Sequence, residues 1–343
     1  NYGKAYAKMD SEPYGFIDPS GAWVIERKFT EAFDFDRGLA RVSEYQGDYP
    51  RMGLIDLDGN YIIRPRFFSI TPFDQHGLAV VALGSGARFA LMNLKGEIIS
   101  NHNYREIYPF KEGLARVKQK HYYGFINTKG ALSISGKYTN AGDFSEGMAF
   151  VKIEGKCGYI NTKGKIVIEP EFSRCMDFDG GKAVVFRGNQ RGGLIDKNGN
   201  VLIEPSINRM LIFTEGRGLV KGDSSKYYYI TEQAQIYDGM YQNAGKFENG
   251  VAVVKENGRW GIINQKGIEI IPPKYDKIEQ FEDGYAKVQI KGFNGLTNLQ
   301  GELIIQPDYE YISYAGEGLF RVEQGDKIGY FDMEGYWVWG LTE

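Results

Sequence analysis

The octet YGFINTKG at residues 123–130 returns almost unchanged as CGYINTKG at residues 157–164. The second residue of this octet is an anchor that occurs ten times, at intervals of 33–38 residues. The anchors are Gly15, Gly53, Ala90, Gly124, Gly158, Gly193, Tyr228, Gly261, Gly295 and Gly329. A second signature, of the type EGLARV, alternates with the anchors along the whole chain. Repetition at a period of this length is typical of stacked supersecondary units.

Each unit begins with a short stretch that has the alternating pattern of a β-strand. In LARV at residues 114–117, Ala115 and Val117 lie on one face. A small residue recurs at the Ala115 position, so we expect close packing on that face. The residue between them varies from unit to unit, and we expect its face to be more open.

The octet itself predicts a second strand and a tight turn. Its Asp or Asn side chain can accept a hydrogen bond from the backbone two residues on, and the closing Gly supplies a positive φ. A third strand follows, as in KIVIEPEF at residues 165–172. We expect proline at its end, where a missing N–H disturbs the ladder least. These prolines are Pro65, Pro170, Pro205, Pro273 and Pro307.

The linker to the next unit carries a phenylalanine three residues before the glycine of the second signature. Recurrence at one place in the unit predicts a buried contact between neighbouring units. The residues concerned are Phe35, Phe110, Phe144, Phe178, Phe213, Phe247 and Phe281. The loop between the first two strands varies most in length, and surface loops of this kind often carry binding differences.

The pattern predicts an all-β fold of about ten three-stranded antiparallel units, in a single repeat domain over residues 1–343. One unit cannot bury both faces of its sheet alone, so neighbours must stack. We expect an open superhelical array, because the unit is shorter than the roughly 40–45 residues of a propeller blade. A closed β-propeller is the alternative. The units start near residues 3, 38, 77, 113, 147, 181, 216, 250, 284 and 318.

One unit carries the signature of a known family. Its sequence WGIIN at residues 260–264, followed by Gly267 and by IIPPKYD at residues 270–276, resembles the WG-repeat (KWG) family of bacterial tandem-repeat proteins. The resemblance extends over almost the whole chain. It implies a bacterial β-repeat scaffold and supplies no catalytic residue. Unit seven, YYYITEQAQ at residues 227–235, departs from the pattern because it lacks both glycines and the Asx residue.

Charge and composition exclude several classes of function. The formal net charge is −3, with acidic and basic residues mixed along the chain. Nucleic-acid binding has little electrostatic support without a basic stripe. We expect no membrane span, because no apolar run approaches the roughly 18–20 residues that one requires. The glycines recur at the repeat period and do not cluster before a helix, so we expect no nucleotide cofactor. The compartment stays open between cell envelope, secreted and cytoplasmic.

Two cysteines, Cys157 and Cys175, form neither a disulfide framework nor a zinc-ligand pattern. A single bridge is one reading, and two separate thiols are the reading we favour. The segment IDLDGN at residues 55–60 superficially resembles a calcium loop with Asp56 and Asp58 as ligands. It lacks the downstream bidentate Glu, so we interpret it as a turn.

No enzyme class is favoured by the arrangement of reactive residues. The three histidines lie at different phases of the repeat and show no nucleophile–base order. They are His76, His102 and His121. Acidic residues recur in segments such as FSEG and FKEG, and a residue repeated in every unit serves the same structural purpose each time. We therefore expect no catalytic residue and no metal site.

Residues that break the repeat pattern are the candidates for binding. Tyr and Trp are enriched at recognition sites because they offer large, rigid and partly polar surfaces. Trp337 and Trp339 are interpreted as end-capping residues. The candidates are Tyr45 and Tyr49 in a long hairpin loop, Tyr227, Tyr228 and Tyr229 in unit seven, and Arg41, Arg116 and Arg321 at the variable strand position. We expect a non-enzymatic scaffold for protein or peptide partners; the alternative is a carbohydrate- or cell-wall-binding module.

Overall fold

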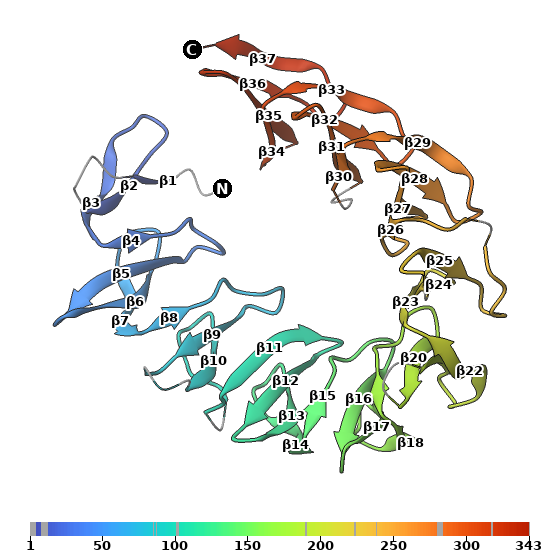
Figure 1. The fold of residues 1–343 in the computed structure, drawn as a ribbon. Coiled ribbons are helices and arrows are strands. Elements are labelled where there is room, and N and C mark those ends of the chain that lie inside the picture. Colours follow the sequence, from blue (N-terminus) through green and yellow to red (C-terminus); the bar gives the residue numbers. More distant parts are fainter. Residues whose placement is uncertain are drawn as a thin grey trace. The chain divides into compact units, whose positions relative to one another are not determined.

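The computed structural model describes residues 5–7, 13–84, 86, 88–100, 103–188, 191–222, 224–237, 239–279, 284–316 and 318–342. Gly3, His102 and Phe281 lie outside the described residues. The chain divides into two compact units, Asn1–Pro170 and Glu171–Glu343. The described residues form no helix, and their strands form ten small antiparallel sheets in tandem, which follow one another along the chain (Figure 1).

The first compact unit holds five of these sheets, except that the last two residues of β18 lie beyond Pro170. Their strands are β1 (Ala5–Ala7), β2 (Tyr14–Ile17) and β3 (Trp23–Phe29); β4 (Glu31–Ala32), β5 (Ala40–Gln46), β6 (Tyr49–Ile55) and β7 (Tyr61–Phe67); β8 (Ser69–Ile70), β9 (Leu78–Ala82) and β10 (Phe89–Asn93); β11 (Glu106–Lys111), β12 (Leu114–Gln119), β13 (Tyr122–Asn127) and β14 (Leu132–Tyr138); β15 (Asn140–Ala141), β16 (Met148–Ile153), β17 (Lys156–Asn161) and β18 (Ile166–Phe172).

The second compact unit holds the other five sheets. Their strands are β19 (Arg174–Cys175), β20 (Lys182–Arg187), β21 (Arg191–Asp196) and β22 (Val201–Asn208); β23 (Met210–Thr214), β24 (Arg217–Lys221) and β25 (Tyr227–Ile230); β26 (Asn243–Ala244), β27 (Val251–Glu256), β28 (Arg259–Asn264) and β29 (Glu269–Tyr275); β30 (Lys277–Ile278), β31 (Tyr285–Ile290), β32 (Phe293–Asn298) and β33 (Leu303–Tyr309); β34 (Tyr311–Gly316), β35 (Leu319–Gln324), β36 (Lys327–Phe331) and β37 (Trp337–Thr342).

Most sheets contain a fourth strand in addition to the three that were predicted for each unit. In most sheets the linker forms a short first strand, as in the order β4-β5-β6-β7. This strand pairs antiparallel with the next one, for example Glu31 with Ser43. The linker can do so because its residues approach the first predicted strand before the chain turns at the glycine of the second signature.

The turn after each octet is held by its Asx side chain, as predicted. The Asn127 Oδ1 atom accepts hydrogen bonds from the N–H groups of Lys129 and Ala131 at 3.0 and 3.1 Å, and Gly130 has a φ of +77°. The Asp56 Oδ1 atom accepts from Asp58 and Asn60 at 3.0 and 2.8 Å, which confirms a turn at residues 55–60. The same pair of bonds forms at Asp18, Asn93, Asn161, Asp196, Asn264, Asn298 and Asp332.

Unit seven keeps this turn with different residues. The Thr231 hydroxyl takes the place of the Asx oxygen and accepts from the N–H groups of Gln233 and Gln235, each at 3.2 Å. Ala234 takes the place of the glycine and has a φ of +60°. A hydroxyl two bonds from Cα reaches the same backbone groups as an Asx oxygen, although more weakly. The departure in sequence is therefore not a departure in turn geometry.

The anchor position needs glycine because the third strand passes too close for a side chain. It does not need glycine for a positive φ. A Cβ on Gly53 would lie 2.4 Å from the carbonyl oxygen of Ile63 and 2.8 Å from the nitrogen of Pro65. The register of β6 and β7 shifts here, because Met52 pairs with Phe67 and Leu54 with Ile63. Proline was expected at the end of this strand, but Pro65 instead lies within the irregular stretch, where no ladder N–H is needed. Pro205, Pro273 and Pro307 lie at the same place.

Two of the ten repeats have a larger residue than glycine at the anchor position. In their described residues, both lack a continuous third strand. The anchor Ala90 is followed by the isolated bridges Phe89–Tyr104 and Met92–Ile98. The anchor Tyr228 is followed by the isolated bridges Tyr227–Tyr241 and Ile230–Ile236. A side chain at the anchor occupies the space that the carbonyl of the third strand takes elsewhere, so that strand cannot approach along its full length.

The core lies between successive sheets. Ala115 and Val117 are completely buried, which confirms the closely packed face of the first predicted strand. The linker phenylalanine packs on the aromatic residue that follows the anchor. The ring centroids of Phe125 and Phe144 are 4.8 Å apart, and those of Phe16 and Phe35 are 4.9 Å apart. Aromatic pairs at such distances add to the hydrophobic burial.

The preference for two separate thiols is wrong. Cys157 and Cys175 are both disulfide-bonded, and neither is a free thiol. Both side chains are buried. The spacing of the two cysteines carried no signal of their bonding, because the state of a buried cysteine is decided by tertiary structure.

Candidate binding clefts between neighbouring repeats

The variable position of the first predicted strand faces the linker of the following repeat. In repeat two this position is Arg41. Its Cζ atom lies 4.2 Å from the centroid of the Phe33 ring, and its Nη1 atom donates a hydrogen bond to the carbonyl oxygen of Ile70 at 3.0 Å. The arginine thus connects the sheet β4-β5-β6-β7 with the linker that leads to repeat three. Burial lowers the pKa of Arg41 from its ordinary value, and the neighbouring Asp36 opposes this shift.

Arg116 forms the equivalent connection in repeat four. Its Cζ atom lies 3.8 Å from the centroid of the Tyr108 ring, and its Nη1 atom donates to the carbonyl oxygen of Ala141. Its Nε atom lies 3.1 Å from the Asp143 Oδ1 atom, in an ion pair that lacks the alignment of a hydrogen bond. Arg41 and Arg116 were predicted as binding residues, and the structure engages both in contacts between neighbouring repeats.

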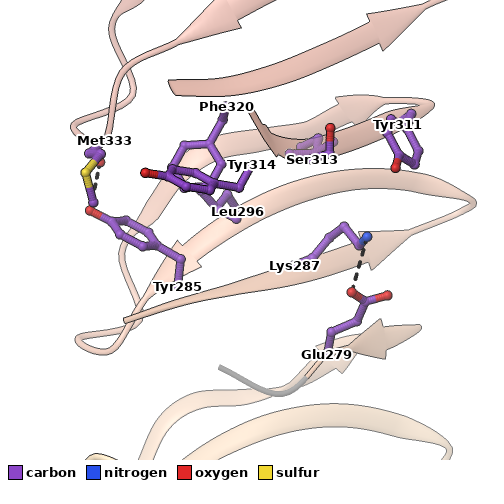
Figure 2. A pocket seen from close by; sticks show the side chains of 10 residues that line it. Glu279, Tyr285, Lys287, Leu296, Tyr311, Ser313, Tyr314, Phe320 and Met333 are labelled. Atoms are coloured by element: carbon purple, nitrogen blue, oxygen red, sulfur yellow. Dashed lines mark hydrogen bonds and ion pairs between the residues drawn. The ribbon is translucent and has the colours of Figure 1, made fainter. Parts of the chain in front are cut away.

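Repeat nine has Lys287 at this position, and a cleft is open beside it. We call it the 9–10 cleft; its volume is about 400 Å³ (Figure 2). It is formed by strands β31 and β32 of one sheet and by β34 and β35 of the next, where β34 is the linker that leads to repeat ten. The lining residues are Glu279, Tyr285, Lys287, Leu296, Tyr311, Ile312, Ser313, Tyr314, Phe320 and Met333.

One end of the 9–10 cleft is aromatic and apolar. The rings of Tyr285 and Tyr314 each meet Phe320 edge to face, with centroids 5.4 and 5.5 Å apart. The Tyr285 hydroxyl donates to the carbonyl oxygen of Met333 at 3.1 Å (Figure 2). Phe320 is buried, whereas Tyr314 is 57% exposed and Tyr311, farther along the cleft, is 48% exposed. The cleft therefore offers aromatic surface to solvent.

The other end of the 9–10 cleft is charged. The Lys287 Nζ atom lies 3.2 Å from the Glu279 Oε2 atom, and the Lys277 Nζ atom lies 2.8 Å from the Glu279 Oε1 atom. These three side chains carry two positive charges and one negative charge. Burial by itself raises the pKa of Glu279, but hydrogen bonds from the two lysines outweigh it and hold that pKa below its ordinary value. Glu279 is therefore ionised at neutral pH.

Repeat three has Val80 at the variable position and a second cleft beside it. This cleft between repeats three and four has a volume of about 630 Å³ and is mainly apolar. Valine is too short to reach the next linker as Arg41 and Arg116 do, so the space stays open. Its lining residues are Thr71, Pro72, Asp74, Leu78, Val80, Phe89, Leu91, Glu106, Ile107, Tyr108, Pro109 and Phe110.

The predicted residues Tyr45 and Tyr49 lie in the strands of a hairpin and not in a long loop: Tyr45 is near the end of β5 and Tyr49 begins β6. They are 66% and 65% exposed. The Arg51 guanidinium lies 3.8 Å from the centroid of the Phe68 ring and 5.7 Å from that of Tyr49. Tyr45 and Tyr49 are thus placed where a partner could contact them.

The predicted tyrosines of unit seven are placed differently. Tyr229 is 2% exposed, and its hydroxyl donates to the carbonyl oxygen of Gly245 at 2.6 Å. Its ring centroid lies 4.8 Å from that of Phe247, and burial raises the pKa of Tyr229. Tyr227 and Tyr228 are half-buried. These residues belong to the core and its edge because they occupy the positions that anchor glycine and its aromatic neighbours fill in other units.

The sequence reasoning missed the residues of the 9–10 cleft, although a signal was present. The position three residues before Gly318 is Ala315, where most other units have the linker phenylalanine. The same linker contains Tyr311 and Tyr314, which no other unit matches with two tyrosines. Arg321, predicted for binding, is half-buried and forms an ion pair with Glu323 on its own strand.

Among the described residues, no group of three or more His, Cys, Asp or Glu side chains is placed to hold a metal ion. No helix in the described part of the chain is long and apolar enough to span a membrane.

Comparison with solved structures places the fold among known β proteins. A crystal structure of a eukaryotic initiation factor is similar with a TM-score of 0.51 and 12% identity, covering 85% of this chain and 94% of that one. BamB from Moraxella catarrhalis is similar with a TM-score of 0.38 and 10% identity, covering 83% and 95% of the two chains. At such low identity the likeness concerns the fold alone.

The curated protein sequences contain no match to this chain. The family model described as WG containing repeat matches it nine times. The matched residues are 14–45, 52–85, 89–120, 123–157, 158–190, 193–227, 235–260, 260–292 and 295–327. Together these matches cover most of the chain, which therefore belongs to the family of proteins built from the WG containing repeat.

Proposed function

We propose that the protein is a non-enzymatic binding scaffold for a protein or peptide partner, with the 9–10 cleft as its binding site. The observation that carries the proposal is the exposed pair Tyr311 and Tyr314 on one strand beside the cleft. Tyrosine dominates many recognition sites because it offers a large contact area with little loss of conformational entropy. Both rings are available to a partner without displacement of a side chain from the core.

The chemistry of the cleft favours binding over catalysis. Its carboxylate, Glu279, has a lowered pKa and is shared between two lysines. A general acid or base works best with a pKa near the operating pH, which such a carboxylate does not have. No histidine is among the described residues that line the cleft.

A carbohydrate is the second candidate ligand. Tyr311 and Tyr314 would offer ring faces to a sugar, and the Lys287–Glu279 ion pair would offer both donors and an acceptor to its hydroxyl groups. The positive excess at the charged end has no counterpart in a neutral sugar, which is why a peptide is preferred here.

The test is a random peptide-display selection and a glycan array, both on the whole protein. We expect peptides to be selected, and we expect Tyr311→Ala to weaken their binding by roughly 30-fold, as truncation of a hot-spot residue of about 2 kcal/mol does. Tyr336→Ala is the matched control, since Tyr336 is 72% exposed and does not line the cleft.

Three outcomes contradict the proposal. Selection of no peptide, with glycans bound instead, would replace the peptide by a carbohydrate ligand. Peptides that bind Tyr311→Ala as well as the wild type do not use the 9–10 cleft. Loss of binding in Tyr45→Ala alone would place the binding site on the exposed β5–β6 hairpin.

A further inference from the structure

We propose that the partner binds the 9–10 cleft as an extended segment that adds a strand to the free edge of β34. This inference rests on the proposed function and deepens it, since it names the conformation and the chemistry of the ligand. In strand addition, main-chain hydrogen bonds supply affinity, and alternate side chains of the ligand enter pockets that supply specificity.

The length of β34 distinguishes it from the first strands of most other sheets. In six sheets the first strand has two residues, whereas β34 has six, Tyr311–Gly316. Very short edge strands prevent unwanted pairing with other chains, and a long edge is a template for pairing. The six short strands are β4, β8, β15, β19, β26 and β30.

The outer edge of β34 is unpaired among the described residues, and the pairing of β34 with β35 is regular over residues 311–314, before the register shifts between Tyr314 and Gly316. The order β34-β35-β36-β37 places β34 at the side of its sheet, and no strand in the described part of the chain pairs with its other edge. Its four residues 311–314 pair in unbroken register with residues 323–320 of β35. A strand held in this way on one side presents a straight row of backbone groups on the other.

β11 provides an internal comparison. It also has six residues and borders the cleft between repeats three and four. Its register is interrupted between Ile107 and Phe110, and Pro109 in that stretch has no N–H to offer. β23 has five residues but borders neither cleft. β34 is therefore the edge best suited to accept a strand.

The two ends of the cleft define the side chains of the ligand. Figure 2 shows Leu296, Phe320 and Met333 at one end, and Lys287 with Glu279 at the other. Residues two apart in a strand point to the same face and lie about 6.5–7 Å apart. A ligand strand along β34 thus directs alternate side chains toward the cleft, and we assign one of them to each end.

The charge at the second end selects an acidic residue. Lys277 and Lys287 share the single carboxylate of Glu279, so one positive charge is left without a counterion among these three groups. A carboxylate of the ligand would complete two ion pairs. The expected ligand is an extended peptide with a large apolar or aromatic residue an even number of positions from an Asp or Glu.

The first test uses a synthetic peptide chosen by the display selection, with each backbone nitrogen methylated in turn. N-methylation removes a donor and adds bulk at the paired edge. We expect binding to fall about tenfold or more at alternate positions and to change little at the positions between them. This period of two is the signature of strand pairing. The contrary result is a peptide whose binding depends on Tyr311 but shows no alternation, either because every methylated form binds or because every methylated form fails to bind. It would overturn the strand-addition inference and leave the proposed function intact.

The second test addresses the acidic residue. Replacement of the peptide Asp or Glu by its amide should weaken binding to the wild-type protein several-fold and should change nothing in Lys287→Gln, because the pair is then already lost. Lys327→Gln is the matched control, since Lys327 does not line the cleft. Equal losses from the amide peptide in the wild type and in Lys287→Gln would refute the charge assignment.

Discussion

A Cβ atom added to Gly53 would lie 2.4 Å from the carbonyl oxygen of Ile63. This single close approach explains why the second octet residue is glycine in most units. The backbone of the third strand passes directly over the anchor, and no side chain fits between them. In every regular repeat the anchor glycine and the third-strand residue that it faces are separated by the same number of residues.

Gly53→Ala should therefore destabilise the protein by about 1–3 kcal/mol, the usual range for overpacking. The control is Gly86→Ala, because nothing lies within 4 Å of its added Cβ. That exposed change should stay within about 0.5 kcal/mol. Denaturant unfolding of both variants measures the difference. Equal midpoints for the two would show that the third strand moves aside at little cost.

Ala234→Gly should stabilise the protein by roughly 0.5 kcal/mol. Ala234 has a φ of +60°, where an L-residue with a Cβ is strained by about 1–2 kcal/mol. The greater entropy of glycine in the unfolded chain offsets part of this gain. Thermal melts should show a higher Tm for the variant. Gly130→Ala, at the same turn position, should lower the Tm, and a change in the same direction for both would contradict the role assigned to this residue.

Arg116→Ala should cost about 1–3 kcal/mol, because it removes a half-buried contact with Tyr108 and leaves the Asp143 carboxylate without its cation. Arg321→Ala is the matched control. Its ion pair with Glu323 lies within one strand and is partly open to solvent, and ion pairs at the surface contribute about 0–1 kcal/mol. Chemical denaturation of both variants measures the loss in the free energy of unfolding. If Arg321→Ala were the more damaging, Arg116 would not be the connection between repeats that we describe.

Acid should weaken the charged end of the 9–10 cleft. The pKa of Glu279 is lower in the folded protein than its ordinary value of 4.5. A lowered pKa means that the contribution to stability is complete above the ordinary pKa and is lost as the pH falls through the folded value. Unfolding measured below about pH 4.5 should therefore lose stability more steeply in the wild type than in Glu279→Gln. Parallel pH profiles for the two proteins would contradict this.

The cysteines should give no reaction with a thiol reagent in denaturant without reductant, because Cys157 and Cys175 are both disulfide-bonded. After reduction, both thiols should react. Reduction should also lower the unfolding midpoint, since native disulfides typically contribute about 2–4 kcal/mol. Two reactive thiols before reduction would return the original interpretation of separate cysteines.

Much of the fold could be predicted from the amino-acid sequence because its determinants are local. The turn at Asn127 is closed by bonds to Lys129 and Ala131, only two and four residues away. Alternation in LARV at residues 114–117 indicated which face of the strand is buried. The repeat period of the anchors implied tandem antiparallel sheets, because a single unit has too little surface to bury a core of its own.

The candidate site could not be predicted in the same way. Arg41, Val80, Arg116 and Lys287 occupy one position of the repeat, and the sequence alone treats them as one variable set. Whether that position is closed by a side chain or opens into a cleft depends on the linker of the next repeat, about 25–30 residues farther along the chain. Such contacts exist only after neighbouring sheets have packed.

The sequence by itself thus determined the period, the strands, the turns and the buried face, since each follows from hydrogen bonds and burial within one unit. Tertiary structure alone decided that Arg41 and Arg116 connect repeats, that Tyr229 is buried, that the cysteines are bonded, and that Tyr311 and Tyr314 line an open cleft. The reason is physical: a side chain acquires these roles from atoms that are distant in the sequence, and the spacing of residues does not encode their distances.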